Sequence, residues 1–305
     1  MDKQNLPELP LKAWEQSQIT LHLWMQIVGK IKLAVMPHQN HWWHITFKVA
    51  TNGLTTGPIP HPQGMFEIEF DFVNHHLHLN TSWGDYGGFK LVDGMSVATF
   101  HKRVFEVLES IEVYPKILGI PYDHPCEEPF AECETHSSYQ ADWVNKFFQV
   151  LVFTNNVFSK FTTRFSGKVS PVHLFWHHLD LAVARFSGKR GPEMSEEAPI
   201  ADRIAYSHET FSAGFWSGDQ NVRGAAFYSY MYPAPEGMEK GALLPEKAWW
   251  EMGSGSPMAM LMYDDLLKSE NPKQDLLDFL QTSFDAGKDL AGWSDELLAD
   301  PHFVD

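Results

Sequence analysis

The chain has 305 residues, of which 44% are hydrophobic and 20% are charged, and this composition is typical of a globular protein with one large domain or two smaller ones. Its 39 acidic residues outnumber 23 basic residues, which gives a formal net charge of −16. Because a negative field repels nucleic acid and anionic lipid, we expect neither a nucleic acid nor a membrane as a partner.

The N-terminal segment has neither the basic start nor the apolar core of a signal peptide, and no apolar run reaches the roughly 18 residues of a membrane span. We therefore expect a soluble, cytoplasmic protein.

The first predicted element is an amphipathic helix that ends near Pro37, because apolar side chains recur at steps of three and four residues. These side chains are Leu21, Trp24, Val28, Ile31 and Val35.

The clearest strand pattern in the chain lies at residues 65–72. Phenylalanine and isoleucine alternate there with glutamate and aspartate, which predicts a half-buried strand with one acidic face. The next residues continue the strand as a hairpin. With a two-residue turn at 74–75, the register places Asp71 opposite His78 and keeps the hydrophobic faces matched.

Two further helices are predicted, over residues 97–111 and 143–161. The segment between them, 126–135, is rich in glutamate and contains a proline, and it has the composition of a linker. It also holds both cysteines of the chain, Cys126 and Cys133. Two thiols predict neither a disulfide framework nor a zinc knuckle, so a reduced protein is expected.

The order of elements suggests a repeated architecture. Four segments have strand composition: 41–49, 172–186, 206–216 and 225–233. A closing helix begins at Asn271, a capping residue that is followed by proline. Since the order helix, strands, helix occurs twice, we predict an α+β fold of antiparallel sheets with packed helices, consistent with an internal duplication. We expect one unit over residues 1–305, with halves at 11–125 and 136–293 joined by the acidic linker.

The pentapeptide RFSGK occurs twice, at 164–168 and 185–189, and residues 160–190 contain six basic residues and one acidic residue. Basic side chains beside Ser-Gly turns can form anion-binding surfaces, so this stretch predicts an anion site. The candidate anion-binding residues are Arg164, Lys168, Arg185 and Lys189. The alternative is structural, since the first copy ends a predicted helix with Gly167 placed as a left-handed cap.

Histidines and carboxylates supply a second group of candidates. The candidates for acid–base catalysis are His208, Glu209, His173 and Asp180. The candidate metal ligands are His41 and His44, together with His208 and Glu209. Such ligands would hold a transition metal as the cofactor, although no spacing in the chain matches a specific metal signature. The alternative is that these histidines are hydrogen-bonded, half-buried structural residues.

Several motifs occur together in this chain: GLTTGPIP, FEIEFDF, NHWWH, SPVHLFW, DLAVARFSGK, YSHE and YPAPEG. The set resembles an uncharacterised bacterial family, a domain of unknown function, from about Leu11 to Trp293. The resemblance implies one family-length unit and supplies no activity. The family pattern implies shared residues at His22, Asn40, His41, His44, His173, Asp180, Arg185, Ser187, Gly188, Tyr206, His208 and Glu209.

Three classes of function stay open from the sequence. The first is a protein or enzyme that binds a small anionic metabolite in a pocket lined by histidine and arginine. The second is a metal-dependent enzyme with histidine and glutamate ligands. The third is a non-catalytic interaction protein whose basic stripe contacts an acidic partner or a second copy of the chain in a homo-oligomer.

Overall fold

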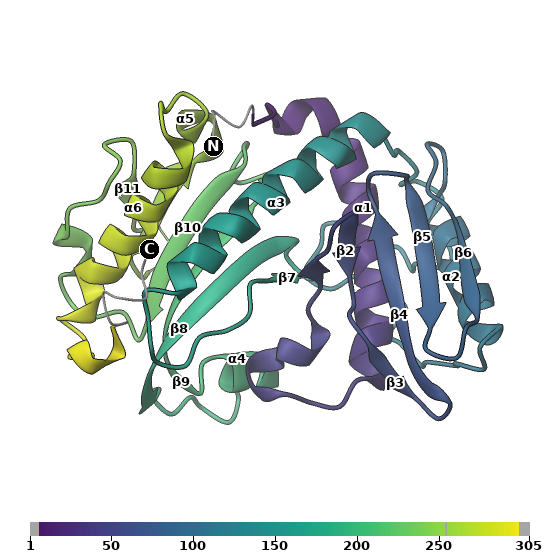
Figure 1. The fold of residues 1–305 in the computed structure, drawn as a ribbon, viewed down its shortest axis with the longest axis horizontal. Helices are drawn as coiled ribbons and strands as arrows, with labels where there is room; N and C mark the ends of the chain where they lie inside the picture. The colour runs from purple at the N-terminus through teal and green to yellow at the C-terminus, as the bar shows by residue number, and fades with distance from the viewer. Residues whose placement is uncertain (1–5, 254, 299–305) are drawn as a thin grey trace.

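The computed structural model describes residues 6–253 and 255–298, and it shows an α+β fold with two antiparallel sheets side by side (Figure 1). The predicted fold class is confirmed. The elements before residue 165 are α1 (Leu11–Val35), η1 (Asn40–Ile45), β1 (Lys48–Val49), β2 (Gly53–Thr55), β3 (Ile59–His61), β4 (Gly64–Asp71), β5 (His76–Thr81), β6 (Tyr86–Lys90), α2 (Val97–Glu109) and α3 (Ala141–Thr162). Those after it are β7 (His173–Phe175), β8 (Asp180–Arg190), α4 (Ile200–Ala205), β9 (His208–Trp216), β10 (Ala226–Tyr232), η2 (Met238–Lys240), β11 (Trp249–Glu251), β12 (Met258–Met262), α5 (Tyr263–Leu266), α6 (Pro272–Lys288) and η3 (Asp295–Leu297).

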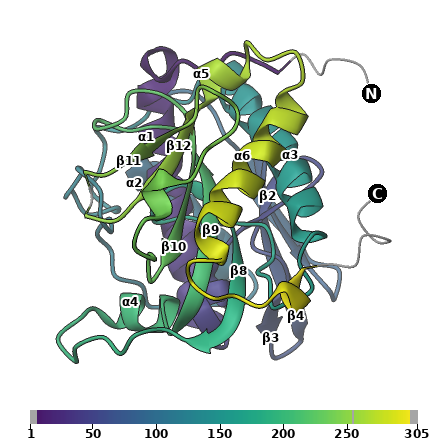
Figure 2. The same cartoon turned by 90° about the vertical axis from the view of Figure 1, so that its left-hand side faces the viewer.

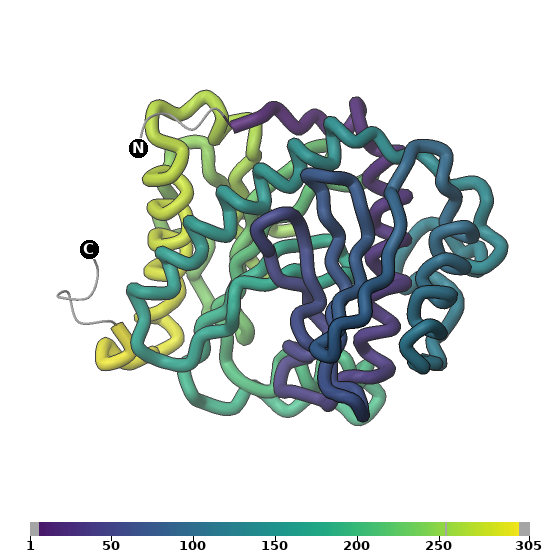
Figure 3. The backbone as a smooth tube through the Cα atoms, turned by 45° about the vertical axis from the view of Figure 1, so that its right-hand side comes forward, coloured from purple at the N-terminus to yellow at the C-terminus, as the bar shows by residue number. Residues whose placement is uncertain are grey.

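The first sheet has the strand order β1-β2-β4-β5-β6, and β3 also pairs with β4. The side chains of β4 alternate as predicted, so its phenylalanines and isoleucine are buried while Glu67 and Glu69 lie on the partly exposed face. Helices α1 and α2 pack beside each other (Figure 3). Phe100 of α2 stacks on Phe70 of β4 with ring centroids 6.0 Å apart, so α2 helps to cover the apolar face of the sheet.

The hairpin between β4 and β5 has a register two residues away from the predicted one, because Glu69 and not Asp71 is opposite His78. The Asp71 carboxylate accepts hydrogen bonds from the amides of Val73 (2.9 Å) and Asn74 (2.7 Å). These bonds close a longer turn at residues 72–75 in place of the predicted two-residue turn. A shift of two residues leaves every side chain on its predicted face.

The second sheet has the order β11-β12-β10-β9-β8-β7. Helices α3 and α6 lie on the same face of this sheet (Figure 2). Phe211 of β9 contacts Phe161 of α3, with ring centroids 6.0 Å apart, and Phe284 of α6, at 5.3 Å. The opposite face of the sheet carries the polar side chains described below.

The segment 172–186 was predicted as one strand, and that prediction is wrong. It forms β7, a tight turn and β8, and Leu179 closes the turn with a left-handed φ of 54°. The turn is fixed by α1, because the His22 Nε2–H donates to the carbonyl oxygens of Trp176 (2.9 Å) and His177 (3.1 Å). Burial lowers the pKa of His22 to about 3, so its ring is neutral.

The two sheets are joined through the backbone, since Phe47 and Leu174 exchange amide–carbonyl hydrogen bonds of 2.9 and 2.8 Å. Helix α3 contacts strands of both sheets, β1 and β8. One cluster of buried apolar side chains contains residues from both predicted halves of the chain. Within the described ranges, no helix is long and apolar enough to cross a lipid bilayer.

Three local predictions also need correction. Residues 41–49 form a strand only at β1, because the preceding residues form η1, whose His41 and Trp42 side chains donate to carbonyl oxygens of α4. The segment 126–135 is no linker, since Phe130 and Cys133 are fully buried in the core. Gly167 lacks the predicted left-handed cap conformation: the left-handed glycine of the repeats is Gly188, which makes a bulge in β8.

Candidate functional site

The two RFSGK copies lie next to each other in the fold. The end of the first copy runs antiparallel to β8, with a bridge between Val169 and Arg185. The amide of Phe186 donates to the Lys168 carbonyl oxygen (3.0 Å), and the amide of Ser170 donates to the Ala184 carbonyl oxygen (2.8 Å). This pairing brings Lys168 against the sheet face opposite α3 and α6.

Lys168 contacts the first of the predicted histidines. Its Nζ donates to His41 Nε2 over 2.8 Å and lies 4.7 Å from the centre of the Phe186 ring and 5.1 Å from that of Trp43. The other ring nitrogen of His41, Nδ1, donates to the carbonyl oxygen of Ala205 (3.0 Å). The His41 tautomer is therefore set, with the proton on Nδ1 and the lone pair of Nε2 facing Lys168.

A second histidine and an arginine complete a group that we call the cationic cluster: Lys168, His41, His208 and Arg190. The His208 ring lies edge-on to His41 at 5.5 Å, and His208 pairs with Arg190 across β9 and β8. Burial lowers the pKa of His208, and the positive charges of Lys168 and Arg190 lower it further. Burial also lowers the pKa values of His41 and Lys168, so positive charge is disfavoured here unless an anion balances it.

No carboxylate in the described part of the chain forms an ion pair with a member of the cationic cluster. The same place carries backbone strain, because His41 and Trp42 have left-handed φ angles of 53° and 62°. Such conformations are unfavourable for side chains larger than glycine and concentrate at functional sites. Helix α4 holds both residues in place. The Ala205 carbonyl oxygen accepts from His41 Nδ1, and the Ala201 carbonyl oxygen accepts from the Trp42 indole (2.9 Å).

A row of polar groups continues from the cluster along the same sheet face. The hydroxyls of Tyr206 and Tyr230 are 3.0 Å apart, and Tyr230 stacks on Tyr228 with ring centroids 6.2 Å apart. Tyr228 donates to Asp180 Oδ2 (2.5 Å), whereas the buried Oδ1 of Asp180 has no partner among the described residues. Burial raises the pKa of Asp180. These hydroxyl and carboxyl groups can accept hydrogen bonds from the uncharged part of a ligand and donate hydrogen bonds to it.

His173 lies on this face as well, because it is two positions along β7 from Phe175, which pairs with Asp180. Its Nδ1 is 3.1 Å from the hydroxyl of Thr46, and burial lowers its pKa to about 3. His44 lies apart from the cluster members: its Nδ1 accepts from the amide of Gln39 (3.1 Å). Both side chains are buried, and the Nδ1 of each has a protein partner.

Glu209 does not join His208. The two are consecutive residues of β9, so they point to opposite faces of the sheet. Glu209 accepts from the Ser187 hydroxyl (2.7 Å) and lines a small pocket of about 120 Å³ with Trp293. Lys189 lies on the same side, where its Nζ donates to the carbonyl oxygens of Ala291 (3.4 Å) and Gly292 (2.9 Å).

The two arginines of the repeats are separate from Lys168 too. Arg185 is fully buried, with its guanidinium 3.4 Å from the centre of the Phe161 ring and its Nη2 donating to the Phe161 carbonyl oxygen (2.6 Å). Arg164 follows the end of α3 and is half-buried. Of the four predicted anion-binding residues, only Lys168 therefore lies in the cationic cluster. Arg190, which the sequence did not single out, joins it because the Gly188 bulge changes the pairing of β8.

Metal-ligating side chains converge elsewhere. In the described part of the chain, the one group of three or more such residues with ligand atoms within 4.8 Å of one another is Cys126, Cys133 and His136. None of the predicted metal ligands belongs to it. The spacing Cys-x6-Cys-x2-His in the sequence is the signal that could have identified this group, but it is visible only when the thiols are considered together with the histidine.

The comparisons with known proteins identify a family. The model of DUF5996, a family of unknown function, matches residues 6–300, which is nearly the whole chain, so the chain belongs to this family. No curated protein and no solved structure matches the chain.

Proposed function

Because membership in a family of unknown function assigns no activity, we propose from the geometry that this protein binds a small anionic ligand at the cationic cluster. The observation that carries the proposal is the convergence of Lys168, His41, His208 and Arg190 without an acidic ion-pair partner in the described residues. A phosphate or carboxylate group supplies the missing negative charge and accepts charge-assisted hydrogen bonds.

The charge of the whole chain favours a small ligand over an anionic macromolecule. With a net charge of −16, the protein repels nucleic acid at long range, whereas a small anion is attracted by the local cationic groups at short range. The half-buried row of Tyr206, Tyr230 and Tyr228 extends from the cluster and offers hydroxyl groups to the remainder of the ligand. The substrate class is therefore a small metabolite with one anionic group and a polar body.

The repeats provide a matched pair of variants for the test. Lys168→Met removes the lysine in the cluster, and Lys189→Met removes the lysine at the same position of the other repeat, which binds only backbone carbonyls. We expect inorganic phosphate or pyrophosphate to bind wild type and K189M, and to bind K168M at least about tenfold more weakly, since a hydrogen bond to a charged group contributes about 1.5–3 kcal/mol. Isothermal titration calorimetry measures the affinities.

The pH dependence gives a second readout of the same site. A bound anion raises the pKa values of His41 and His208, which burial and neighbouring cations lower in the free protein. Binding is therefore coupled to proton uptake, and the affinity should rise as the pH falls. Equal affinities of K168M and K189M, or no saturable binding of phosphate, pyrophosphate or a dicarboxylate to wild type, would refute the proposal.

A further inference from the structure

A second site lies in the connection between α2 and α3, within and just after the segment 126–135. The thiols of Cys126 and Cys133 and a ring nitrogen of His136 lie within 4.8 Å of one another. Cys133 is fully buried, and the other two side chains are half-buried. Both cysteines are free, so no disulfide explains why the thiols meet.

The structure contains an unsatisfied group at this place. The Nδ1 of His136 is buried and has no hydrogen-bond partner in the described part of the protein. A buried polar nitrogen without a partner carries a desolvation cost of roughly 1–3 kcal/mol. A bound cation would use its lone pair and remove this cost, because a neutral imidazole nitrogen is a common metal ligand.

The backbone around these side chains is fixed from several directions. The first two amides of α2 donate to this segment: the amide of Val97 to the His136 carbonyl oxygen and the amide of Ala98 to the Cys133 carbonyl oxygen, each at 3.0 Å. The amide of Cys133 donates to the Pro129 carbonyl oxygen (3.0 Å). These bonds hold two of the three ligand residues against the start of a helix, so the site is preorganised.

The loop is also anchored to α1. Gln26 of α1 donates to the carbonyl oxygen of Tyr122 (2.9 Å) and accepts from its amide (2.7 Å), and Lys30 donates to the carbonyl oxygen of Ile120 (2.8 Å). Phe130, between the two cysteines, is fully buried in the core. Thus the segment that carries the ligands is packed on two helices by the protein's own contacts.

We propose that Cys126, Cys133 and His136 bind one zinc ion. Two thiolates and an imidazole are the ligand types of structural zinc sites, and softness of the sulfur ligands disfavours magnesium and calcium. Zinc–sulfur and zinc–nitrogen bonds of about 2.3 and 2.0 Å place neighbouring ligand atoms about 3.5 Å apart, which falls within the 4.8 Å that bounds these three atoms. Each thiol releases its proton to solvent as it becomes a thiolate.

Zinc takes four ligands, and the fourth would be water or the carboxylate of Glu128, which interacts with the Cys133 thiol and the His136 ring but does not lie within 4.8 Å of all three ligand atoms. A bound ion would clamp the loop between α2 and α3 onto α1. This inference is independent of the proposed anion site, because the two share no residue.

The test is the metal content of the full-length protein, reduced and purified without added metal, and then titrated with Zn²⁺. We expect one zinc ion per chain in wild type by inductively coupled plasma mass spectrometry, and loss of that ion in Cys126→Ser and His136→Gln. His178→Gln is the matched control, since this exposed histidine pairs with Asp123 near the same loop and should keep the ion.

Cobalt substitution keeps the test decisive if a variant is unstable. Co²⁺ added to metal-free wild type should give the intense absorption of thiolate-to-cobalt charge transfer, and Cys126→Ser should weaken it. Cys126 is the better cysteine to change because it is only half-buried. If reduced wild type binds neither ion in stoichiometric amount, or if the cysteines are joined by a disulfide in the native protein, the zinc site is refuted.

Discussion

His173 shows how strongly burial changes a single residue in this protein. Thr46 donates its own hydroxyl proton to the Trp43 carbonyl oxygen (3.0 Å), so the hydroxyl oxygen is free to accept from His173 Nδ1–H. Burial, followed by the charges of Lys32 and Lys48, lowers the pKa of His173 to about 3. In the unfolded chain the same ring titrates near its ordinary value of about 6.5.

This difference predicts acid sensitivity. Between pH values of about 6.5 and 3, the unfolded chain binds a proton at His173 that the folded chain does not, so the stability present above that range is lost as the pH falls. The loss from this residue approaches about 1.4 kcal/mol per pH unit. We expect His173→Gln to have a shallower dependence of the free energy of unfolding on pH, measured by urea denaturation at several pH values between 7 and 5.

The exposed His178 serves as the control for this effect. His178→Gln should leave the slope nearly unchanged, because the His178 side chain and its partner Asp123 are both exposed and such a pair contributes little to stability. If both variants have the wild-type slope, His173 is not buried in its neutral form in solution.

At the residue scale, the sequence predicted which side chains could carry charge chemistry but not which would meet. Lys168 and Arg185 both come from RFSGK copies, yet one contacts His41 and the other lies in the apolar core. The copies differ because one follows a helix and the other belongs to a strand, where neighbouring side chains point to opposite faces. Pairing across strands, which composition does not reveal, decided the membership of the cationic cluster.

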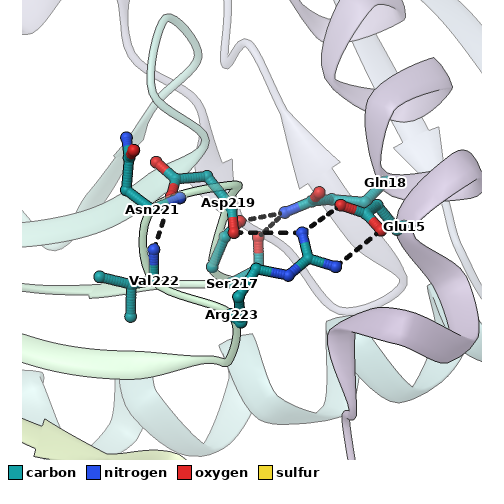
Figure 4. Close-up of polar contacts among 8 residues, drawn as sticks. Glu15, Gln18, Ser217, Asp219, Asn221, Val222 and Arg223 are labelled. Carbon is teal, nitrogen blue, oxygen red and sulfur yellow. Dashed lines mark hydrogen bonds and ion pairs between the residues drawn. The ribbon is translucent and has the colours of Figure 1, made fainter.

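At the scale of elements, the loop between β9 and β10 docks on α1 through two unequal contacts (Figure 4). Gln18 of α1 donates from its Nε2 to the Ser217 hydroxyl (2.8 Å) and to the Gly218 carbonyl oxygen (2.7 Å), and these groups are buried. Arg223 of the loop makes a two-pronged ion pair with Glu15, but its side chain is 50% exposed. Water therefore competes with the second contact and not with the first.

Substituting each donor by methionine separates the two contributions. Gln18→Met should lower the free energy of unfolding by about 1–3 kcal/mol, because the buried Ser217 and Gly218 groups lose a partner without much change in volume. Arg223→Met should cost less than about 1 kcal/mol, since exposed ion pairs contribute little. Equilibrium urea denaturation measures both, and the reverse order of losses would show that the loop docks differently.

Elements with their own periodicity were predictable, and elements fixed by distant partners were not. The helical period of α1 and the alternation in β4 follow from the sequence because each pattern is local, although α1 is buried all around and not along one stripe. The η1 kink depends on Ala201 and Ala205 of α4, and the turn after β7 depends on His22 of α1. Since such tertiary contacts override local propensity, the strands expected there were wrong or too long.

On the scale of the whole molecule, α1 connects the two predicted halves. Every residue from 23 to 32 is buried, which is unusual for a surface helix and typical of a helix enclosed on all sides. The sequence predicted the order helix, strands, helix twice, and the structure has that order. It could not predict that α1 also contacts the turn between β7 and β8, because that contact depends on the close approach of Trp176 to Gly29.

Gly29 provides a test of this packing. A methyl group added at Gly29 would lie 2.3 Å from the Trp176 ring, which is itself buried and cannot move aside freely. Alanine is a better helix former than glycine by about 1 kcal/mol, so an open site would be stabilised by the change. We expect Gly29→Ala instead to lower the free energy of unfolding by about 1–3 kcal/mol, because overpacking outweighs helix propensity.

Gly287 in α6 is the matched control within the same protein. There the added methyl group would meet the sulfur atoms of Met231 (2.6 Å) and Met238 (3.0 Å), and these flexible side chains can adjust. Gly287→Ala should therefore lose less stability than Gly29→Ala, as measured by urea denaturation.

Replacing the indole ring by a smaller side chain in Trp176→Leu should reduce the loss of stability caused by Gly29→Ala. A double-mutant cycle measures this coupling. If Gly29→Ala is as well tolerated as Gly287→Ala and shows no coupling to residue 176, the turn of the second sheet does not rest on α1.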